Sequence, residues 1–253
     1  MSNPHVIRGN SIYSIVDGPG WTEAETNAIK LGGHLVTIND ADGVAITASE
    51  LSDIGSSTTG VVTVTNAVAI TGTAAEVTAA LVTAGSLVVV SDAAVTITGN
   101  PTITELNDIA AKTTGVVTAT LAAASLTALG SLDTASTDDI TITVNDADDA
   151  AVTAANLSTL GGKTAGTVTV SNAVAITGSV AEATAALVTA GTKVVAGTAK
   201  VTVTGTPTIT QLNDIGDATT GVVTATLAAA SLSDLGSLDT ASTDVITVTV
   251  NDA

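Results

Sequence analysis

The segment VVTVTNAVAITGTAAEVTAALVTAG at 61–85 decides the fold of this chain. Its first five residues alternate with period two and are rich in β-branched side chains, which indicates a strand. An Asn-Ala corner and a second short strand, VAIT at 68–71, follow. Thr73 and Glu76 then have the spacing of a helix capping box, and Gly85 is the expected C-cap. The segment therefore predicts one coil made of strand, corner, strand and helix.

The same coil returns as part of a much longer repetition. Residues 41–146 recur at 147–252 with a constant offset of 106, so that Asn66 becomes Asn172. Self-similarity at a fixed period is the signature of a repeat architecture. Because an active site is normally a single unrepeated set of residues, the repetition argues against an enzyme.

A shorter period divides each long repeat. Runs that resemble strands are spaced by about 26 residues, which lies in the range of α/β solenoids, and they centre near Val62, Val89, Val117, Ile142 and Val168. Short helices are expected with inward pairs Leu51/Ile54, Leu106/Ile109 and Leu157/Leu160. Stacking of successive strands in parallel would bury these pairs under a helical layer. We therefore expect an α/β repeat solenoid of about eight coils, divided into residues 1–40, 41–146 and 147–253.

The composition supports a thin core. Aromatic residues make up 1% of the 253 residues, too few for an ordinary globular interior, whereas 45% of residues are hydrophobic and the mean hydropathy is +0.53. These values also argue against a disordered acidic tail. A solenoid, in which each coil packs only on its neighbours, suits a core of Val, Ala, Ile and Leu.

Charge and residue types narrow the functional classes. A net charge of −18 disfavours nucleic acid and anionic membranes as partners. No apolar run is long enough to span a bilayer, and no cleavable signal peptide is visible. With two His and no Cys, no catalytic or metal-binding set based on these residues is expected. We predict no enzyme and no cofactor, with calcium as the one candidate ion.

The first forty residues differ from the repeats. They hold the Trp and the Tyr, and we expect them to form an atypical N-terminal cap in which Trp21 and Tyr13 cover the end of the core. Residues 11–40 resemble the opening of a C-type lectin-like domain at Tyr13, Trp21, Ala24, Ala28, Gly32, Gly33, His34, Leu35 and Ile38. The disulfide cysteines and the calcium- and sugar-binding triplets of that family are absent. The resemblance therefore implies shared ancestry for this segment and does not imply lectin activity.

An acidic corner is the candidate metal site. Asn145, Asp146, Asp148 and Asp149 follow one strand and precede the next, and oxygen ligands of this kind suit Ca²⁺. Asn-Asp pairs are also ordinary turn chemistry at a solenoid corner. We favour the turn interpretation and keep calcium as the alternative.

Threonine pairs are the second candidate feature. In a parallel stack they would form two ranks on a flat face, as in ice-binding solenoids: Thr63/Thr65, Thr118/Thr120, Thr141/Thr143, Thr224/Thr226 and Thr247/Thr249. Because Thr is favoured in half-exposed strands anyway, we favour a structural role.

The repeats resemble those of long, acidic, Thr/Ala/Val-rich surface and secreted proteins of bacteria, cyanobacteria in particular. The motifs TTGVVTATLAAASL, SLDTASTD and ITVTVNDA carry this resemblance. It implies a non-enzymatic structural and adhesive segment located outside the cell or on its surface, with cell-surface polysaccharide as a candidate partner. Calcium-dependent carbohydrate or ligand binding and ice binding are the alternatives. The chain ends directly after a strand-like VNDA motif, so we expect a longer array and self-association through an open C-terminal end.

Overall fold

The computed structural model of the chain describes residues 5–8, 11–14, 37–58, 60–83, 85–189 and 191–252. The chain divides into two compact units. The first comprises Met1–Thr98 and Ala111–Gly115, and the second comprises Gly99–Ala110 and Val116–Ala253. Both units are α/β, with short parallel strands and short helices.

The first unit begins with an antiparallel pair, β1 and β2, and continues with two interleaved series of parallel strands. One series has the order β3-β5-β7, and in the other β6 lies between β4 and β8. The elements are β1 (His5–Arg8), β2 (Ser11–Ser14), β3 (Thr37–Ile38), β4 (Ala45–Thr47), α2 (Ala48–Ser56), β5 (Val62–Val64), β6 (Ala69–Thr73), α3 (Ala74–Val77), η1 (Thr78–Val82), β7 (Val88–Val90) and β8 (Ala94–Thr98).

The second unit also contains two series of parallel strands. One has the order β14-β12-β10-β9 and the other β11-β13-β15-β16-β17. The elements are α4 (Ile103–Ala110), β9 (Val117–Thr120), α5 (Leu126–Leu129), β10 (Asp139–Val144), β11 (Ala151–Thr153), α6 (Ala154–Gly161), β12 (Val168–Val170), β13 (Ala175–Ser179), α7 (Val180–Leu187), β14 (Val194–Val195), β15 (Lys200–Thr204), α8 (Ile209–Asp217), β16 (Val223–Thr226), α9 (Leu232–Leu235) and β17 (Val245–Thr247).

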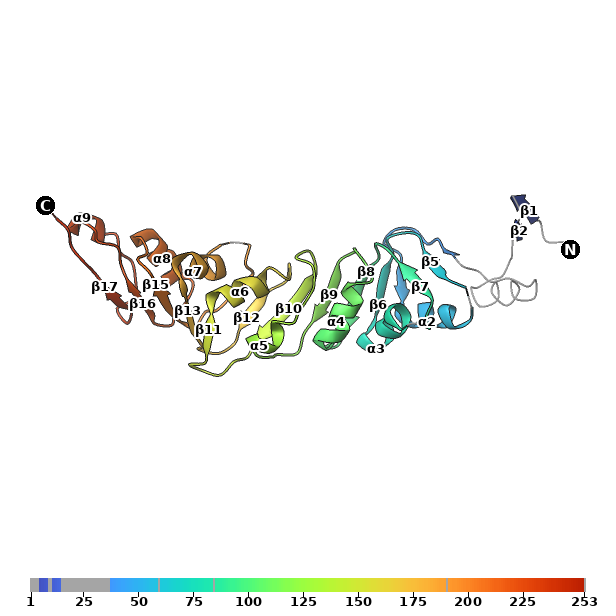
Figure 1. Cartoon of the computed structure of the whole chain (residues 1–253), viewed down its shortest axis with the longest axis horizontal. Helices are drawn as coiled ribbons and strands as arrows, with labels where there is room; N and C mark the ends of the chain where they lie inside the picture. The colour runs from blue at the N-terminus through green and yellow to red at the C-terminus, as the bar shows by residue number, and fades with distance from the viewer. Residues whose placement is uncertain are drawn as a thin grey trace. The chain divides into compact units, whose positions relative to one another are not determined.

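Helices cover the strands of the second unit in chain order. α6 packs on α7 and α7 on α8, and each of α6 and α7 contacts the strand that precedes it, as Figure 1 shows. The predicted inward pairs Leu106/Ile109 and Leu157/Leu160 are buried. In the first unit Leu51 is buried but Ile54 is only half-buried, because the buried Gly55 takes the next inward position on α2.

The predicted parallel pairing of successive coils is confirmed at two steps. Thr63 faces Val89 where β5 pairs with β7, and Ile142 faces Val168 where β10 pairs with β12. The second step joins the two long repeats, because β10 belongs to the first and β12 to the second. β10 has two partners: Asp139–Thr141 pair with β9, and Ile142–Val144 pair with β12.

The expected stacking of each strand-like run on the preceding run is not found at β16. This strand pairs with β15 and not with β14, and Thr202 faces Thr224. The reason lies just before the strand. The Thr219 hydroxyl donates to the carbonyl oxygen of Ala199 at 2.6 Å, and Ala199 directly precedes β15. Anchoring at Ala199 sets β16 beside β15.

The helix that opens at Thr73 also ends earlier than expected. The predicted capping box is present, because Thr73 caps α3 and exchanges hydrogen bonds with Glu76. α3 then passes into the π-helical turn η1, whose C-cap is Thr83 rather than Gly85. The Thr83 N–H donates to the Thr78 carbonyl at 2.9 Å, and this wider turn closes the helix before Gly85 is reached.

The N-terminal cap prediction falls mainly on residues outside the described part of the chain. The expected helix at 21–31, with Trp21, lies there, as do 15–36 generally. Tyr13 lies in strand β2, and Thr37–Ile38 form β3, which pairs in parallel with β5.

Candidate functional site: the acidic corner and the coil junctions

The acidic corner connects β10 to β11, and its three carboxylates bind three different donors. Asp146 accepts from the backbone N–H of Leu126 at 2.6 Å, at the start of α5. Asp148 accepts from the N–H of Ala173 at 2.8 Å. Asp149 pairs with Lys200 at 2.5 Å, and both of these side chains are largely exposed.

Asn145 contributes its backbone to the same corner. Its N–H donates to the carbonyl of Ala124 at 3.0 Å, and its carbonyl lies 3.4 Å from the amide nitrogen of Asn172. The four candidate residues therefore join the corner to three segments, at residues 124–126, at residues 172–173 and at Lys200. Ca²⁺ takes six to eight oxygen ligands, and the described residues contain no group of three or more His, Cys, Asp or Glu side chains placed to hold a metal.

An equivalent corner lies 106 residues earlier, at residues 39–42, where the first repeat begins. Asp42 accepts from the N–H of Ala67 at 3.0 Å, as Asp148 does from Ala173. The Asn66 side chain donates to the carbonyl of Asp40. Corner side chains thus bind the backbone of the following coil in both repeats, which is the behaviour of turn residues that join coils.

A Thr-x-Gly motif before four of the strands was not identified from the sequence as a structural feature. Its signal is the recurrence of Thr-x-Gly with the glycine two residues before the start of a strand, at Thr58/Gly60, Thr113/Gly115, Thr164/Gly166 and Thr219/Gly221. In each case the Gly N–H donates to the Thr hydroxyl oxygen, at 2.8–3.0 Å. Three of these hydroxyls also bond to a backbone carbonyl of an earlier coil, on Ala93, Asp138 and Ala199.

The glycine of this motif is required by close approach of two backbones. A Cβ atom on Gly166 would lie 2.5 Å from the carbonyl oxygen of Ile140, and one on Gly221 would lie 2.2 Å from that of Ala199. Real Cβ atoms essentially never come within 3.0 Å of another heavy atom. Any side chain at these positions would push the coils apart.

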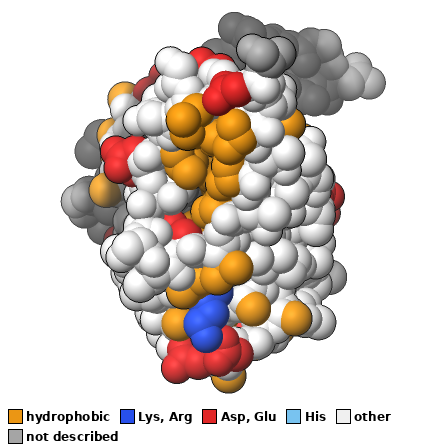
Figure 2. All heavy atoms as spheres, turned by 90° about the vertical axis from the view of Figure 1, so that its left-hand side faces the viewer, with side chains coloured by type: hydrophobic (Ala, Val, Ile, Leu, Met, Phe, Trp, Pro, Cys, Tyr) orange, Lys and Arg blue, Asp and Glu red, His pale blue; other side chains and the backbone are white. Residues whose placement is uncertain are grey.

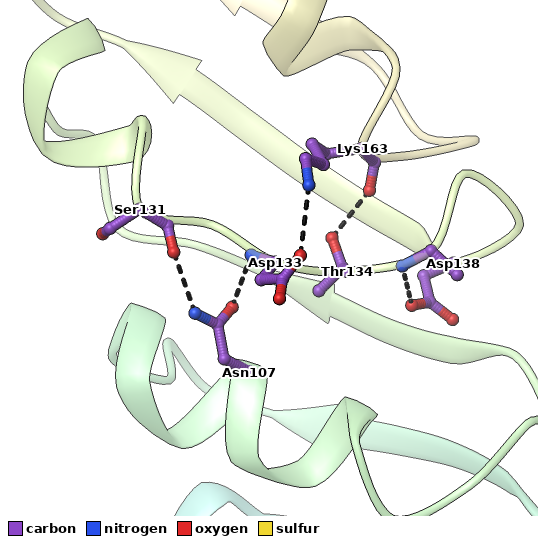
Figure 3. Close-up of polar contacts among 7 residues, drawn as sticks. Asn107, Ser131, Asp133, Thr134, Asp138 and Lys163 are labelled. Atoms are coloured by element: carbon purple, nitrogen blue, oxygen red, sulfur yellow. Dashed lines mark hydrogen bonds and ion pairs between the residues drawn. The ribbon is translucent and has the colours of Figure 1, made fainter.

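Figure 3 shows the side chains that link α4 to the segment before β10. Asn107 donates to the carbonyl of Ser131 at 2.9 Å and accepts from the N–H of Asp133 at 2.8 Å. Thr134 donates to the carbonyl of Lys163 at 2.6 Å, and the Lys163 ammonium lies 3.1 Å from Asp133 (Figure 3). The two contacts of Lys163 tie the first repeat to the second.

The second repeat contains the same asparagine link. Asn213 donates to the carbonyl of Ser237 and accepts from the N–H of Asp239, each at 2.9 Å. The role of this asparagine could have been inferred from its presence at the same helix position in both repeats, within TITELNDI and TITQLNDI.

Capping boxes hold acidic side chains at the helix starts. Hydrogen bonds from the backbone N–H and the hydroxyl of Thr73 lower the pKa of Glu76, and Ser179 does the same to the pKa of Glu182. The hydroxyl and backbone of Thr47 lower the pKa of Glu50. These carboxylates are solvent-exposed and act as helix caps.

The threonine ranks are interrupted. Thr169 faces Val195 between β12 and β14, and Thr118 faces Asp139 between β9 and β10. A flat surface of matched threonines therefore does not extend along the strands of the second unit.

Comparison of the chain with family models, characterised proteins and solved structures finds no match. Within the described residues, no helix is long and apolar enough to cross a membrane.

Proposed function

We propose that residues 41–252 form a solenoid of stacked coils that acts as a structural and adhesive segment of an exported or surface-attached bacterial protein. In this proposal the segment spaces and presents other parts of its protein and carries out no catalysis. Each coil would pack on the next through its parallel strands and helix, as in other repeat proteins.

The recurrence of the same inter-coil bonds after 106 residues is the observation that supports this proposal best. Thr113 binds the carbonyl of Ala93 and Thr219 that of Ala199, both at 2.6 Å. These polar side chains are used in bonds between coils, as expected of a structural segment. The acidic and polar surface suits a segment that stays hydrated outside the cell.

Location is tested on cells that produce the protein. An antibody raised against residues 41–252 is expected to label intact cells, and brief protease treatment of those cells should remove the signal. A cytoplasmic protein labelled in parallel reports any lysis. Labelling that appears only after lysis would contradict an exported or surface location.

Adhesion is tested with the purified chain. We expect it to bind intact cells of the producing organism, with surface polysaccharide as the ligand class. Periodate oxidation of the cell-surface sugars should reduce the binding, whereas protease treatment of the same cells should not. Equal binding to oxidised and untreated cells would reject polysaccharide as the ligand.

A further inference from the structure

The two repeats end in coils of nearly identical sequence whose exposure differs. In the first repeat Leu126 is 6% exposed, whereas the equivalent Leu232 is 66% exposed. Val144 is fully buried and its equivalent Val250 is 53% exposed. Because the residues are the same in both coils, the difference in exposure must come from the segment that covers the first coil.

The cover over the first of these coils is the first coil of the second repeat. Helix α6 packs against α5, which carries Leu126, and β12 pairs with Ile142–Val144. Thr164 accepts from the N–H of Ile140 at 2.8 Å, and Gly166 fits against the Ile140 carbonyl. Residues 147–173 therefore contain both the apolar and the hydrogen-bonding parts of the cover.

The second repeat presents the same surface without that cover. Figure 2 looks onto the end of the second unit that carries α9 and β17, and it shows a band of hydrophobic side chains there. The exposed members are Leu232, Val245, Val248 and Val250. We call the surface formed by residues 227–252 the terminal face.

We propose that the terminal face is a docking surface for the first coil of another 106-residue repeat, of the type formed by residues 147–173. This inference rests on the proposed stacking of coils. A helix equivalent to α6 would cover Leu232, and a strand equivalent to β12 would pair with residues 248–250. The threonine equivalent to Thr164 would accept from the N–H of Ile246.

The N-terminal coil of a second copy of residues 1–253 does not fit this surface. In that coil β3 already pairs with β5, and the Thr65 N–H donates to the Ile38 carbonyl at 3.1 Å. Thr65 and Ile38 are equivalent to Ser171 and Val144, and the Ser171 N–H donates to the Val144 carbonyl at 3.0 Å where β12 joins β10. In a second copy, β3 therefore already occupies the place on β5 that the terminal face would need. The matching occupant is therefore a repeat whose first coil resembles residues 147–173 and is connected directly to the terminal face.

The experiment extends the chain and measures access to the face. Appending residues 148–252 after Ala253 places Ala253 where Ala147 stands in the first junction. Because the chain has no Cys, Leu232→Cys provides a unique thiol for maleimide labelling. We expect this thiol to react fast in the 253-residue chain and at least about 10-fold more slowly in the extended chain, since covered sites react only through local opening.

Two controls separate docking from stacking itself. Leu126→Cys should react slowly in both chains, because the existing junction covers it. In the extended chain, Ala at the appended position equivalent to Gly166 should restore fast labelling of Leu232→Cys. If Leu126→Cys reacts as fast as Leu232→Cys in the parent chain, the stacked-coil proposal fails. If Leu126→Cys is protected but extension leaves Leu232→Cys unchanged, only the docking proposal fails.

Discussion

The last coil of the first repeat and the last coil of the second have almost the same sequence but different surroundings. Ile142 and Val144 are fully buried beneath β12, whereas Val248 and Val250 are 42% and 53% exposed. The apolar pattern of this coil therefore specifies which residues can be buried, and the following coil determines whether they are. In repeat proteins the interface between neighbouring repeats adds to the stability of each repeat itself, so equivalent residues should contribute unequally here.

Truncating the equivalent leucines should give the largest difference. Leu126→Ala is expected to lower the free energy of unfolding by about 2–5 kcal/mol, the usual loss for a buried leucine. Leu232→Ala should change it by about 0.5 kcal/mol or less, as for surface substitutions. Urea unfolding of both variants measures the contrast, and equal losses would show that the two coils have the same environment.

Adding a methyl group at a backbone contact should have the next largest effect. Gly166→Ala places a Cβ 2.5 Å from the Ile140 carbonyl, whereas Gly197→Ala meets no atom within 4 Å. We expect Gly166→Ala to cost about 1–3 kcal/mol through forced backbone shifts. Gly197→Ala should be close to neutral in the same unfolding assay. A neutral Gly166→Ala would mean that the junction of the two repeats is looser than described.

Several features of the fold follow from local sequence patterns. The capping box at Thr73 and Glu76 and the buried face of α4 at Leu106 and Ile109 depend on spacings within one element, so the sequence predicts them correctly. Parallel pairing of β5 with β7 also follows, because the repeat places like strands next to each other.

The change of partner at β16 could not be predicted in the same way. It depends on Thr219 and Gly221 contacting Ala199, a long-range contact between backbones that strand propensity does not encode. The hydrogen-bond partners of the acidic corner also lie far from it in the sequence. Asp146 binds Leu126, and Asp149 binds Lys200 across 51 residues. The sequence identifies the carboxylates of the corner, but it does not identify the groups that donate hydrogen bonds to them.

Acidic pH should weaken the helix starts that carry a glutamate cap. The pKa values of Glu76 and Glu182 are lowered in the folded chain, so their stabilisation is complete above the ordinary pKa of 4.5 and is lost as pH falls through the lowered value. The Tm should therefore fall on acidification below this range.

The matched control for this pH dependence occurs in the chain itself. Gln211 caps α8 with Thr208 in the same geometry and carries no charge. The double variant Glu76→Gln, Glu182→Gln should keep its helices at neutral pH and show a shallower loss of Tm in acid. An unchanged slope would indicate that other carboxylates cause the acid sensitivity.

Calcium is expected to have the smallest effect. Binding at the acidic corner would have to compete with Lys200 for Asp149 and with the Ala173 N–H for Asp148. We predict a slight rise in Tm at millimolar Ca²⁺ through ligand linkage, and Asp148→Asn with Asp149→Asn should reduce it. Absence of any shift would remove the calcium proposal and leave turn chemistry as the role of the corner.

Amide hydrogen exchange along the 253-residue chain tests most directly whether the following coil determines burial. Strands that have neighbours on both sides in both repeats, such as β6 and β13, should exchange at similar rates at equivalent positions. The amides of Ile140 and Ile142, which are bonded to Thr164 and Thr167, should exchange much more slowly than those of Ile246 and Val248. Equal protection of these two pairs would contradict the account.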